Sequence, residues 1–183
     1  MRVAFLGLGH MGLPMALNLG AAGYEVIGFD VYPATQQAAT DAGVTVADSA
    51  LAAATDADVV ITMFQSGQQV HDAYTGGLLK AAPPGTLFID CSTIAVDEAQ
   101  AAHDLATAVG HRSIDAPVSG GVVGAQAGTL AFMVGGAVED VAAATPLLEV
   151  MGSRVVHCGG PGLGQAAKVC NNLILAVSQI AVA

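Results

Sequence analysis

The sequence predicts a doubly wound α/β fold with a mostly parallel sheet, followed by the start of a long helix. Short apolar runs alternate with Ala-rich stretches along the chain, which is the order of strands and helices in such folds. The run DVVITM at 58–63 is apolar at successive positions, as expected of a central parallel strand covered on both faces. From Leu163 to Ala183 no residue breaks a helix.

Strands are predicted where the short apolar runs lie. Helices are predicted where Ala-rich segments separate those runs, because Ala is a strong helix former. Asp48 is expected to cap the helix that runs through Ala54. In chain order, strands are expected at 2–6, 25–30, 44–46, 58–63, 86–90, 113–116, 130–134 and 154–157. Helices are expected at 11–22, 34–42, 48–54, 68–74, 95–109, 138–151 and from 163 onwards.

Length and composition exclude several classes of protein. The chain has 183 residues, of which 54% are hydrophobic and 11% charged, so it can bury a core and is not disordered. Five basic residues against 15 acidic residues give a net charge of −10, which disfavours nucleic acid and anionic membrane surfaces as partners. No apolar run is long enough to span a membrane.

The N-terminal segment lacks the long apolar stretch of a signal peptide, since glycines interrupt it from Gly7 onwards. Three cysteines without a CxxC pair are expected to be buried free thiols in a reducing compartment, which favours a cytoplasmic location. The five histidines show no HxH or HxxxH spacing, so no metal site is predicted.

The first motif that carries chemistry is Gly7-Leu8-Gly9-His10-Met11-Gly12. It follows a predicted strand and opens a predicted helix, as the dinucleotide-binding turn of a Rossmann fold does. Gly7 then permits the tight turn, Gly9 lets a pyrophosphate approach the backbone, and Gly12 lets the helix pack closely on the strand. The alternative is a glycine-rich turn without a ligand.

Asp30 ends the second predicted strand, about 20 residues after the glycines, where an acid accepts hydrogen bonds from the adenosine ribose. A carboxylate there repels a 2′-phosphate, and no Arg follows it in the segment 31–33. The predicted cofactor is therefore NAD rather than NADP. The alternative is that Asp30 serves only as a helix cap or turn residue.

The second motif, DAPVSGGVVGAQAGT at 115–129, lies at the carboxyl end of a predicted strand. Its small residues leave backbone N–H groups free to face a ligand such as a carboxylate, although a tight loop without a ligand is the alternative. Ser119 is not a hydrolase nucleophile, because the leading Gly of the nucleophile elbow is missing.

The third motif is GLGQAAKVCNN at 162–172. Lys168 is the one basic residue after Arg154 and lies in an apolar, Ala-rich helix. Asn172 follows it by four residues, so the two share a helix face. A Lys in such surroundings can have a lowered pKa and can donate or accept a proton. The alternative is a surface Lys that reaches out from the helix.

Together, the three motifs resemble the β-hydroxyacid dehydrogenase family. DAPVSGG followed by GxGxxxKxxNN is specific to this family and is not shared with Rossmann dehydrogenases in general. The resemblance covers the whole chain. The matching stretches are GLGHMGLPMALNL, FDVYP, DADVVITM, AYTGG, FIDCSTI, DAPVSGG, GTLAFMVGG and GQAAKVCNN.

The resemblance implies roles for individual residues. Lys168 corresponds to the catalytic acid/base. The substrate contacts are Ser119, Gly120, Gly121 and Asn172, and the cofactor contacts beyond the first motif and Asp30 are Met63, Phe64, Gln69 and Thr93. Two positions depart from the family pattern: Gln65 stands where a Pro is usual, and Gln69 stands where an Asn is common.

The implied activity is NAD-dependent oxidation of 3-hydroxyisobutyrate to methylmalonate semialdehyde, with hydride passing to nicotinamide and Lys168 as acid/base. The alternatives are reduction of tartronate or succinate semialdehyde within the same family, and a non-catalytic NAD-binding fragment. The expected partners are a small β-hydroxy acid or semialdehyde, and further copies of the chain in a homo-oligomer.

The expected organisation is a Rossmann domain at 1–162 and the start of an interdomain helix at 163–183. Family members continue into an all-helical domain that closes the substrate cleft and builds the dimer. The sequence is therefore expected to be a truncated part of a longer enzyme. Its last helix carries Leu173, Ile174, Leu175, Val177 and Ile180, which are expected to be exposed and to drive association.

Overall fold

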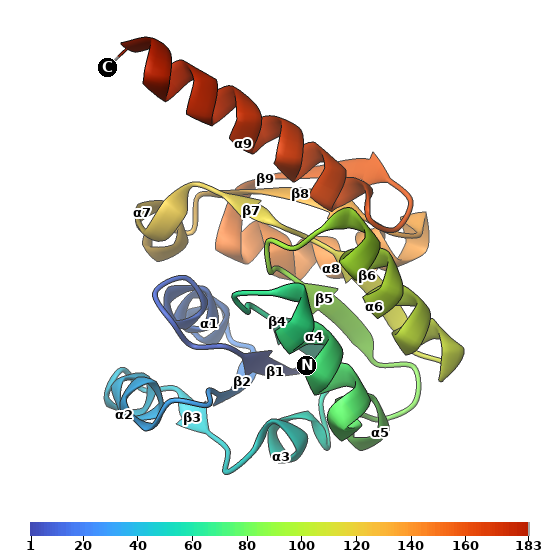
Figure 1. Ribbon diagram of the computed structural model, residues 1–183. Coiled ribbons are helices and arrows are strands. Elements are labelled where there is room, and N and C mark those ends of the chain that lie inside the picture. Colours follow the sequence, from blue (N-terminus) through green and yellow to red (C-terminus); the bar gives the residue numbers. More distant parts are fainter. Residues whose placement is uncertain (183) are drawn as a thin grey trace.

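The apolar runs pair edge to edge in the computed structural model, which describes residues 1–182 (Figure 1). Within these residues the strands form one sheet in the order β3-β2-β1-β4-β5-β6-β8-β7, and β9 pairs with β8. The strands are β1 (Arg2–Leu6), β2 (Glu25–Phe29), β3 (Thr45–Val46), β4 (Val59–Thr62), β5 (Leu87–Asp90), β6 (Arg112–Asp115), β7 (Val118–Ser119), β8 (Leu130–Gly135) and β9 (Gly152–Gly159).

Helices connect most of the strands and pack on both faces of the sheet (Figure 1). The helical segments are α1 (Gly12–Ala21), α2 (Pro33–Asp41), α3 (Ala50–Ala54), α4 (Gly67–Ala73), the π-helical turn η1 (Tyr74–Leu78), α5 (Leu79–Ala81), α6 (Val96–Ala108), α7 (Gly121–Ala127), α8 (Val138–Met151) and α9 (Leu163–Val182).

The sheet is wound outwards in two directions from β1. This strand pairs in parallel with β2 on one side and with β4 on the other. The remaining neighbours up to β6 are also parallel, as are β8 and β9, whereas β8 runs antiparallel to β6 and β7. The predicted Rossmann-type, mostly parallel sheet is confirmed. In such sheets the ligand crevice lies outside the carboxyl ends of the strands, where the strand order reverses.

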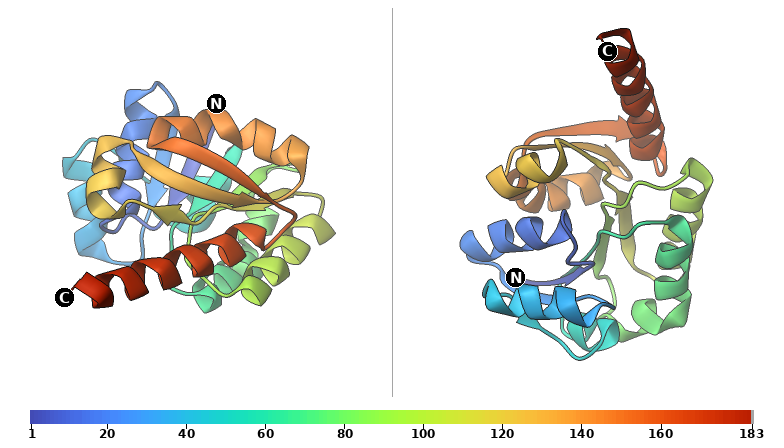
Figure 2. Two further views of the ribbon diagram at one scale, coloured as in Figure 1. Left: turned by 90° about the horizontal axis from the view of Figure 1, so that it is seen from above. Right: turned by 60° about the vertical axis from the view of Figure 1, so that its left-hand side comes forward.

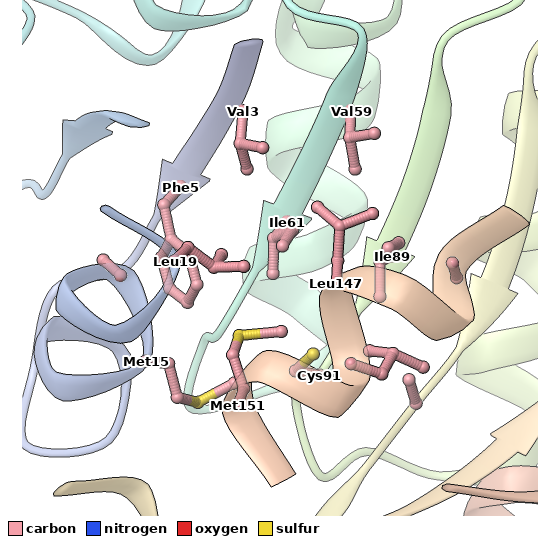
Figure 3. Close-up of a cluster of buried hydrophobic side chains, with 14 of the residues drawn as sticks. Val3, Phe5, Met15, Leu19, Val59, Ile61, Ile89, Cys91, Leu147 and Met151 are labelled. Atoms are coloured by element: carbon pink, nitrogen blue, oxygen red, sulfur yellow. The ribbon is translucent and has the colours of Figure 1, made fainter. Parts of the chain in front are cut away.

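Alternate residues of the central strands face two different apolar layers. Val3 and Phe5 of β1 pack with side chains of α1 and α8 (Figure 3). Ala4 and Leu6 of the same strand pack against the opposite layer, which α3, α4 and α6 provide. All four residues of β4 are buried. Because both faces of the sheet are covered, its central strands are apolar at successive positions.

The predicted cap of α3 was wrong. The side chain of Ser49 accepts a hydrogen bond of 3.0 Å from the Ala52 N–H, whereas Asp48 is exposed. The helix begins at Ala50, so the capping position is one residue later than predicted.

Ser49→Ala is expected to lower the free energy of unfolding by about 1 kcal/mol, because the first turn of α3 loses its acceptor. Urea denaturation measures this change. Asp48→Ala is the matched control, and we expect it to leave the unfolding midpoint within error of the wild type. An equal loss in both variants would contradict the assignment of the cap to Ser49.

Two further local predictions were incomplete. The helix expected to end at Tyr74 continues through η1 into α5 and ends at Ala81. Gly77 adopts a non-helical conformation with a φ of +116° in this stretch, so the helical segment is kinked at this glycine. No strand or helix was predicted in the segment 117–129, but it contains β7 and α7.

The last helix, α9, packs with its first turns on the sheet and then extends beyond the rest of the molecule (Figure 2). Its predicted course is confirmed as far as Val182, while Ala183 lies outside the described residues. The expectation of buried cysteines was wrong for Cys170, which is exposed on this helix. Among residues 1–182, no helix is both long and apolar enough to cross a membrane.

Candidate functional site

The glycine motif forms the turn between β1 and α1, and its glycines have different surroundings. Gly7 has a φ of +93°, and its N–H donates to the Phe29 carbonyl at 2.9 Å. A Cβ atom at Gly12 would collide with the Gly7 carbonyl oxygen, so this position must be glycine for α1 to pack on β1. A Cβ at Gly9 would meet nothing within 4 Å. The turn therefore leaves open space where the sequence predicts a ligand.

Asp30 lies directly after β2 and is 8% exposed. Its carboxylate accepts a hydrogen bond of 2.7 Å from the Leu8 N–H and another of 3.0 Å from the Tyr32 N–H. The side chain thus stabilises both its own turn and the glycine turn. Each carboxylate oxygen can accept a further hydrogen bond, so this turn role is compatible with contact to a ribose.

The loops after β4 and β5 are joined to each other. The Phe64 N–H donates to Ser92 Oγ at 2.8 Å. Met63 and Phe64 are half-buried, whereas Thr93 is exposed. These residues lie at the carboxyl ends of β4 and β5, and β4 is one of the two strands between which the strand order reverses.

The two departures from the family pattern lie in this region and contact each other. The Gln65 N–H donates to Gln69 Oε1 at 2.9 Å. A proline at position 65 has no N–H, so it could not make this hydrogen bond. Gln69 is therefore bonded to its own loop through one lone pair of Oε1. It can contact a cofactor through its NH₂ group, through the second lone pair of Oε1, or after this hydrogen bond opens.

The DAPVSGG motif folds into the short strand β7 and the start of α7. Gly120 and Gly121 have φ values of +132° and +61°, which disfavour other residue types. Asn171 Nδ2 donates to Ser119 Oγ at 3.4 Å, so α9 lies against this motif. Asn172, the residue expected to orient a substrate, is exposed. The sequence singled out Asn172, but Asn171 makes this contact with Ser119.

Lys168 is 8% exposed although it carries an amine. Burial lowers the pKa of this amine below its ordinary value, because desolvation disfavours the charged form. Within residues 1–182, no acidic side chain forms a salt bridge with it. The alternative of a surface Lys is therefore excluded in this structure. At a given pH, a larger fraction of this amine is neutral than in a lysine exposed to solvent.

Two buried carboxyl groups lie side by side at the ends of β5 and β6, where Asp90 is the register partner of Asp115. Burial raises the pKa of Asp115, although the N–H groups of Gly162 and Gln165 each donate to its carboxylate at 2.8 Å. Burial also raises the pKa of Asp90, and the neighbouring Asp115 charge raises it further. Thr62 Oγ1 donates to Asp90 at 2.8 Å.

A family model described as the NAD binding domain of 6-phosphogluconate dehydrogenase matches residues 2–160. The chain belongs to this family. The matched range includes the whole sheet and every helix before α9. The family model describes an NAD-binding domain, in agreement with the dinucleotide-binding turn that the glycine motif predicted.

Named relatives of the NAD-binding domain confirm the resemblance to β-hydroxyacid dehydrogenases. A probable 3-hydroxyisobutyrate dehydrogenase of Mycobacterium tuberculosis is 55% identical over 99% of this chain and 61% of that protein. An NAD-dependent L-serine dehydrogenase of Pseudomonas aeruginosa is 49% identical over 100% of this chain and 62% of that protein. The chain thus spans about three fifths of these relatives.

A solved structure shows the same arrangement of the backbone. It is described as M. tuberculosis 3-hydroxyisobutyrate dehydrogenase with L-serine, and it is 54% identical to this chain with a TM-score of 0.96. The superposition covers 100% of this chain and 63% of that one. The predicted fold, including the long last helix, is therefore found in a relative of known structure.

The residues of the NAD-binding domain fit the cofactor. Open space at Gly9 leaves room for a pyrophosphate. The first turn of α1 has no acidic residue, and in the described structure no side chain caps it, so this helix end can face a phosphate. The Leu13 N–H donates to the Gly9 carbonyl and Pro14 has no N–H, so the phosphate would be met by the glycine turn that precedes them. Asp30 has spare acceptor capacity beside the glycine turn.

Sequence reasoning missed the buried polar residues that connect these parts. Ser92 joins the loops after β4 and β5, while Asp115 and Gln165 hold the start of α9. Asp115 and Gln165 were part of quoted motifs but received no role. Their contacts join residues 50 to 73 positions apart, so local spacing gave no signal for them.

Proposed function

We propose that this chain is the cofactor-binding part of an enzyme that oxidises a small β-hydroxy acid with NAD, and that the substrate is 3-hydroxyisobutyrate. The observation that carries the proposal is the buried Lys168, which forms no salt bridge with any acidic side chain of residues 1–182 and lies one turn from the Asn171–Ser119 contact. Burial of an unpaired amine lowers stability, so such a residue is a candidate for a functional role. The helix turn just before Lys168 is bonded to Asp115 and Ser92, at the carboxyl ends of β6 and β5.

Lys168 acts as general base in the oxidation and takes the proton of the substrate hydroxyl. Its lowered pKa favours the neutral amine that this step needs. Ser119, Gly120 and Gly121 hold the substrate carboxylate through the hydroxyl and the backbone N–H groups, and Asn172 orients the substrate. When bound, NAD supplies the hydride acceptor at nicotinamide C4. In the reverse direction Lys168 returns the proton and a semialdehyde is reduced.

The proposed cofactor contacts follow the edge of the sheet. The backbone of Gly7, Leu8, Gly9, His10, Met11 and Gly12 receives the pyrophosphate, and Asp30 binds the adenosine ribose. Met63, Phe64 and Gln69 line the passage of the cofactor beyond β4, and Thr93 contacts the nicotinamide side. The exposure of Thr93 and the half-buried state of Met63 and Phe64 agree with these roles.

L-Serine is a second candidate substrate. The observation that favours it is the similarity to an L-serine dehydrogenase and to a solved structure described with L-serine. Chemically, L-serine and 3-hydroxyisobutyrate are both 3-hydroxy acids, and they differ in an amino or a methyl group at the second carbon. The same carboxylate and hydroxyl contacts therefore serve both compounds.

Formation of NADH tests the proposal with 3-hydroxyisobutyrate and L-serine in parallel, using the protein at full length. Tartronate and succinate semialdehydes are tested in the reverse direction with NADH. A higher kcat/KM for 3-hydroxyisobutyrate than for L-serine supports the proposed substrate. NAD binding without turnover of any of these compounds would instead support a non-catalytic NAD-binding fragment.

Asp30→Asn is expected to narrow the preference for NAD over NADP, because it removes the charge that repels a 2′-phosphate and keeps the shape of the side chain. NAD affinity should fall by about 10- to 150-fold, since a hydrogen bond to a charged acceptor is worth about 1.5–3 kcal/mol. Calorimetric titration of both cofactors measures the change. Asp41→Asn, the same change at the exposed end of α2, is the control. Equal affinities for NAD and NADP in the wild type would contradict this prediction.

We also propose that residues 1–162 form the cofactor-binding unit and that the second half of the helix from Leu163 is an association surface. Its second half exposes large apolar side chains on several sides, including Leu173, Ile174 and Ile180. Patches of this kind drive association.

Light scattering of the chain is expected to show a homo-oligomer or larger species whose fraction rises with protein concentration. The double substitution Leu173→Glu with Ile180→Glu should return the chain to a monomer, because charges on this surface oppose burial. A monomer of the unmodified chain at high concentration would contradict the assignment.

A further inference from the structure

Gln165 lies in the first turn of α9 and is 0% exposed, although its side chain is polar. Both ends of its amide are used. Nε2 donates to the Ser92 carbonyl at 2.7 Å, and Oε1 accepts from the Ile94 N–H at 3.3 Å. One buried side chain therefore binds the backbone of the segment 92–94 on both sides of Thr93.

The segment 92–94 is itself fixed to the neighbouring strand ends. Ser92 Oγ accepts from the Phe64 N–H, and the Ser92 N–H donates to Asp90 at 3.1 Å. The hydrogen bonds thus run without a gap from the loop after β4, through the loop after β5, to α9. These loops carry three of the proposed cofactor contacts, Met63, Phe64 and Thr93.

The start of α9 is also held by Asp115. Its carboxylate accepts from the Gly162 and Gln165 N–H groups. A Cβ atom at Gly164 would lie 2.7 Å from this carboxylate, so the close approach requires glycine there. Lys168 follows Gln165 by three residues and lies on the same side of the helix. The position of Lys168 is therefore set by two groups one turn before it.

We propose that Gln165 is a positioning residue that sets the distance between the amine of Lys168 and the segment 92–94. The inference rests on the proposed function, in which Lys168 moves the substrate proton and Thr93 contacts the nicotinamide side. An apolar residue would fill the same space, but it would not hold the segment at a fixed distance. Misplacement of reacting groups by about 1 Å can cost about 100-fold in rate.

The first test needs no catalysis and uses the chain as printed. Its two lysines, Lys80 and Lys168, are methylated with ¹³C and followed by NMR during a titration with NAD. Lys80→Arg assigns the signals. In the wild type, NAD is expected to shift the Lys168 signal and to leave that of the exposed Lys80 unchanged. In Gln165→Met the Lys168 shift should fall to less than about half, while the dissociation constant of NAD stays within about threefold.

The second test measures turnover of 3-hydroxyisobutyrate by the protein at full length. Gln165→Met is expected to lower kcat by about 10- to 100-fold with little change in KM, because only the geometry of the reacting groups changes. Gln165→Glu keeps the acceptor for the Ile94 N–H and loses the donor to Ser92, so its kcat should be intermediate. Gln37→Met, the same change at an exposed position of α2, should leave kcat unchanged.

The outcomes separate this inference from the proposed function. Unchanged kcat and an unchanged Lys168 signal in Gln165→Met would overturn the positioning role. Loss of NAD binding or of folding in both Gln165 variants would also overturn it, because Gln165 would then be a structural residue. If the wild type turns over no hydroxy acid, the proposed function fails, and the NMR titration still decides whether Gln165 positions Lys168.

Discussion

Lys168→Ala is expected to lower kcat for 3-hydroxyisobutyrate oxidation by about 10²–10⁴-fold, the usual contribution of general acid–base catalysis. The affinity for NAD should hardly change, because Lys168 is assigned to the substrate side of the site. Lys168→Arg should not restore activity, since a guanidinium stays protonated and cannot accept the hydroxyl proton. Steady-state kinetics of the protein at full length, with NAD titrated separately, measures both quantities.

Lys80→Ala is the matched control for this experiment, because Lys80 is exposed on α5 and is the other lysine of the chain. It should keep wild-type kinetics. Substantial kcat in Lys168→Ala would assign the proton transfer to another group. Loss of NAD binding in that variant would show instead that Lys168 supports the fold or the cofactor.

The same lysine connects function with stability. Folding lowers the pKa of the Lys168 amine, so the charged amine destabilises the folded state. This penalty has its full size at any pH below the folded-state pKa. It disappears as the pH rises from that value to the ordinary pKa of 10.5. Lys168→Met should therefore have a thermal midpoint equal to or above that of the wild type at pH 7. This difference should shrink at alkaline pH. A higher thermal midpoint of the Met variant would support the proposal that Lys168 serves catalysis although it lowers stability.

Asp115→Ala is expected to lower the free energy of unfolding by about 2–5 kcal/mol. The substitution leaves the buried N–H groups of Gly162 and Gln165 without their acceptor, and each unsatisfied group costs about 1–3 kcal/mol. For a chain of this size the thermal midpoint should fall by about 5–15 °C. Thermal and urea unfolding of the chain measure the loss. Asp104→Ala, the same change at an exposed position of α6, is the control and should have little effect.

A result near zero for Asp115→Ala would mean that α9 does not depend on this carboxylate. Asp115→Asn refines the experiment, because it keeps one carbonyl oxygen as an acceptor but adds an NH₂ group that faces backbone donors. We expect its loss to be smaller than that of the Ala variant. The same thermal scans decide the order of the two.

The sheet and the cofactor turn were predictable from the sequence because each depends on a local requirement. A strand covered on both faces is apolar at successive positions, as 58–63 shows. A turn that takes a positive φ at Gly7 and brings α1 against β1 at Gly12 needs glycine at both positions. Each requirement involves residues that are only a few positions apart in the sequence. It can therefore be recognised without knowing which elements pack against these residues.

Boundaries and short elements were less predictable. Ser49 and Asp48 are both good capping residues, and the choice between them depends on where α3 meets the sheet. Strand β7 has two residues and α7 begins at two glycines, so neither has a periodic pattern of its own. The formation of β7 depends on antiparallel pairing with β8, which follows it in the chain.

The sequence by itself determined the order of strands and helices, the glycine turn, the acid at the end of β2 and the amine on the last helix. Only the tertiary structure decided that Asp115 holds the first turn of α9 and that Gln165 joins this helix to the segment 92–94. The physical reason is that a buried polar group must find a partner, but that partner can come from any strand end that the sheet order brings beside it. The spacing of residues along the chain does not predict which partner a buried polar group finds. The reason is that β5, β6 and the start of α9 become neighbours only when the sheet has formed.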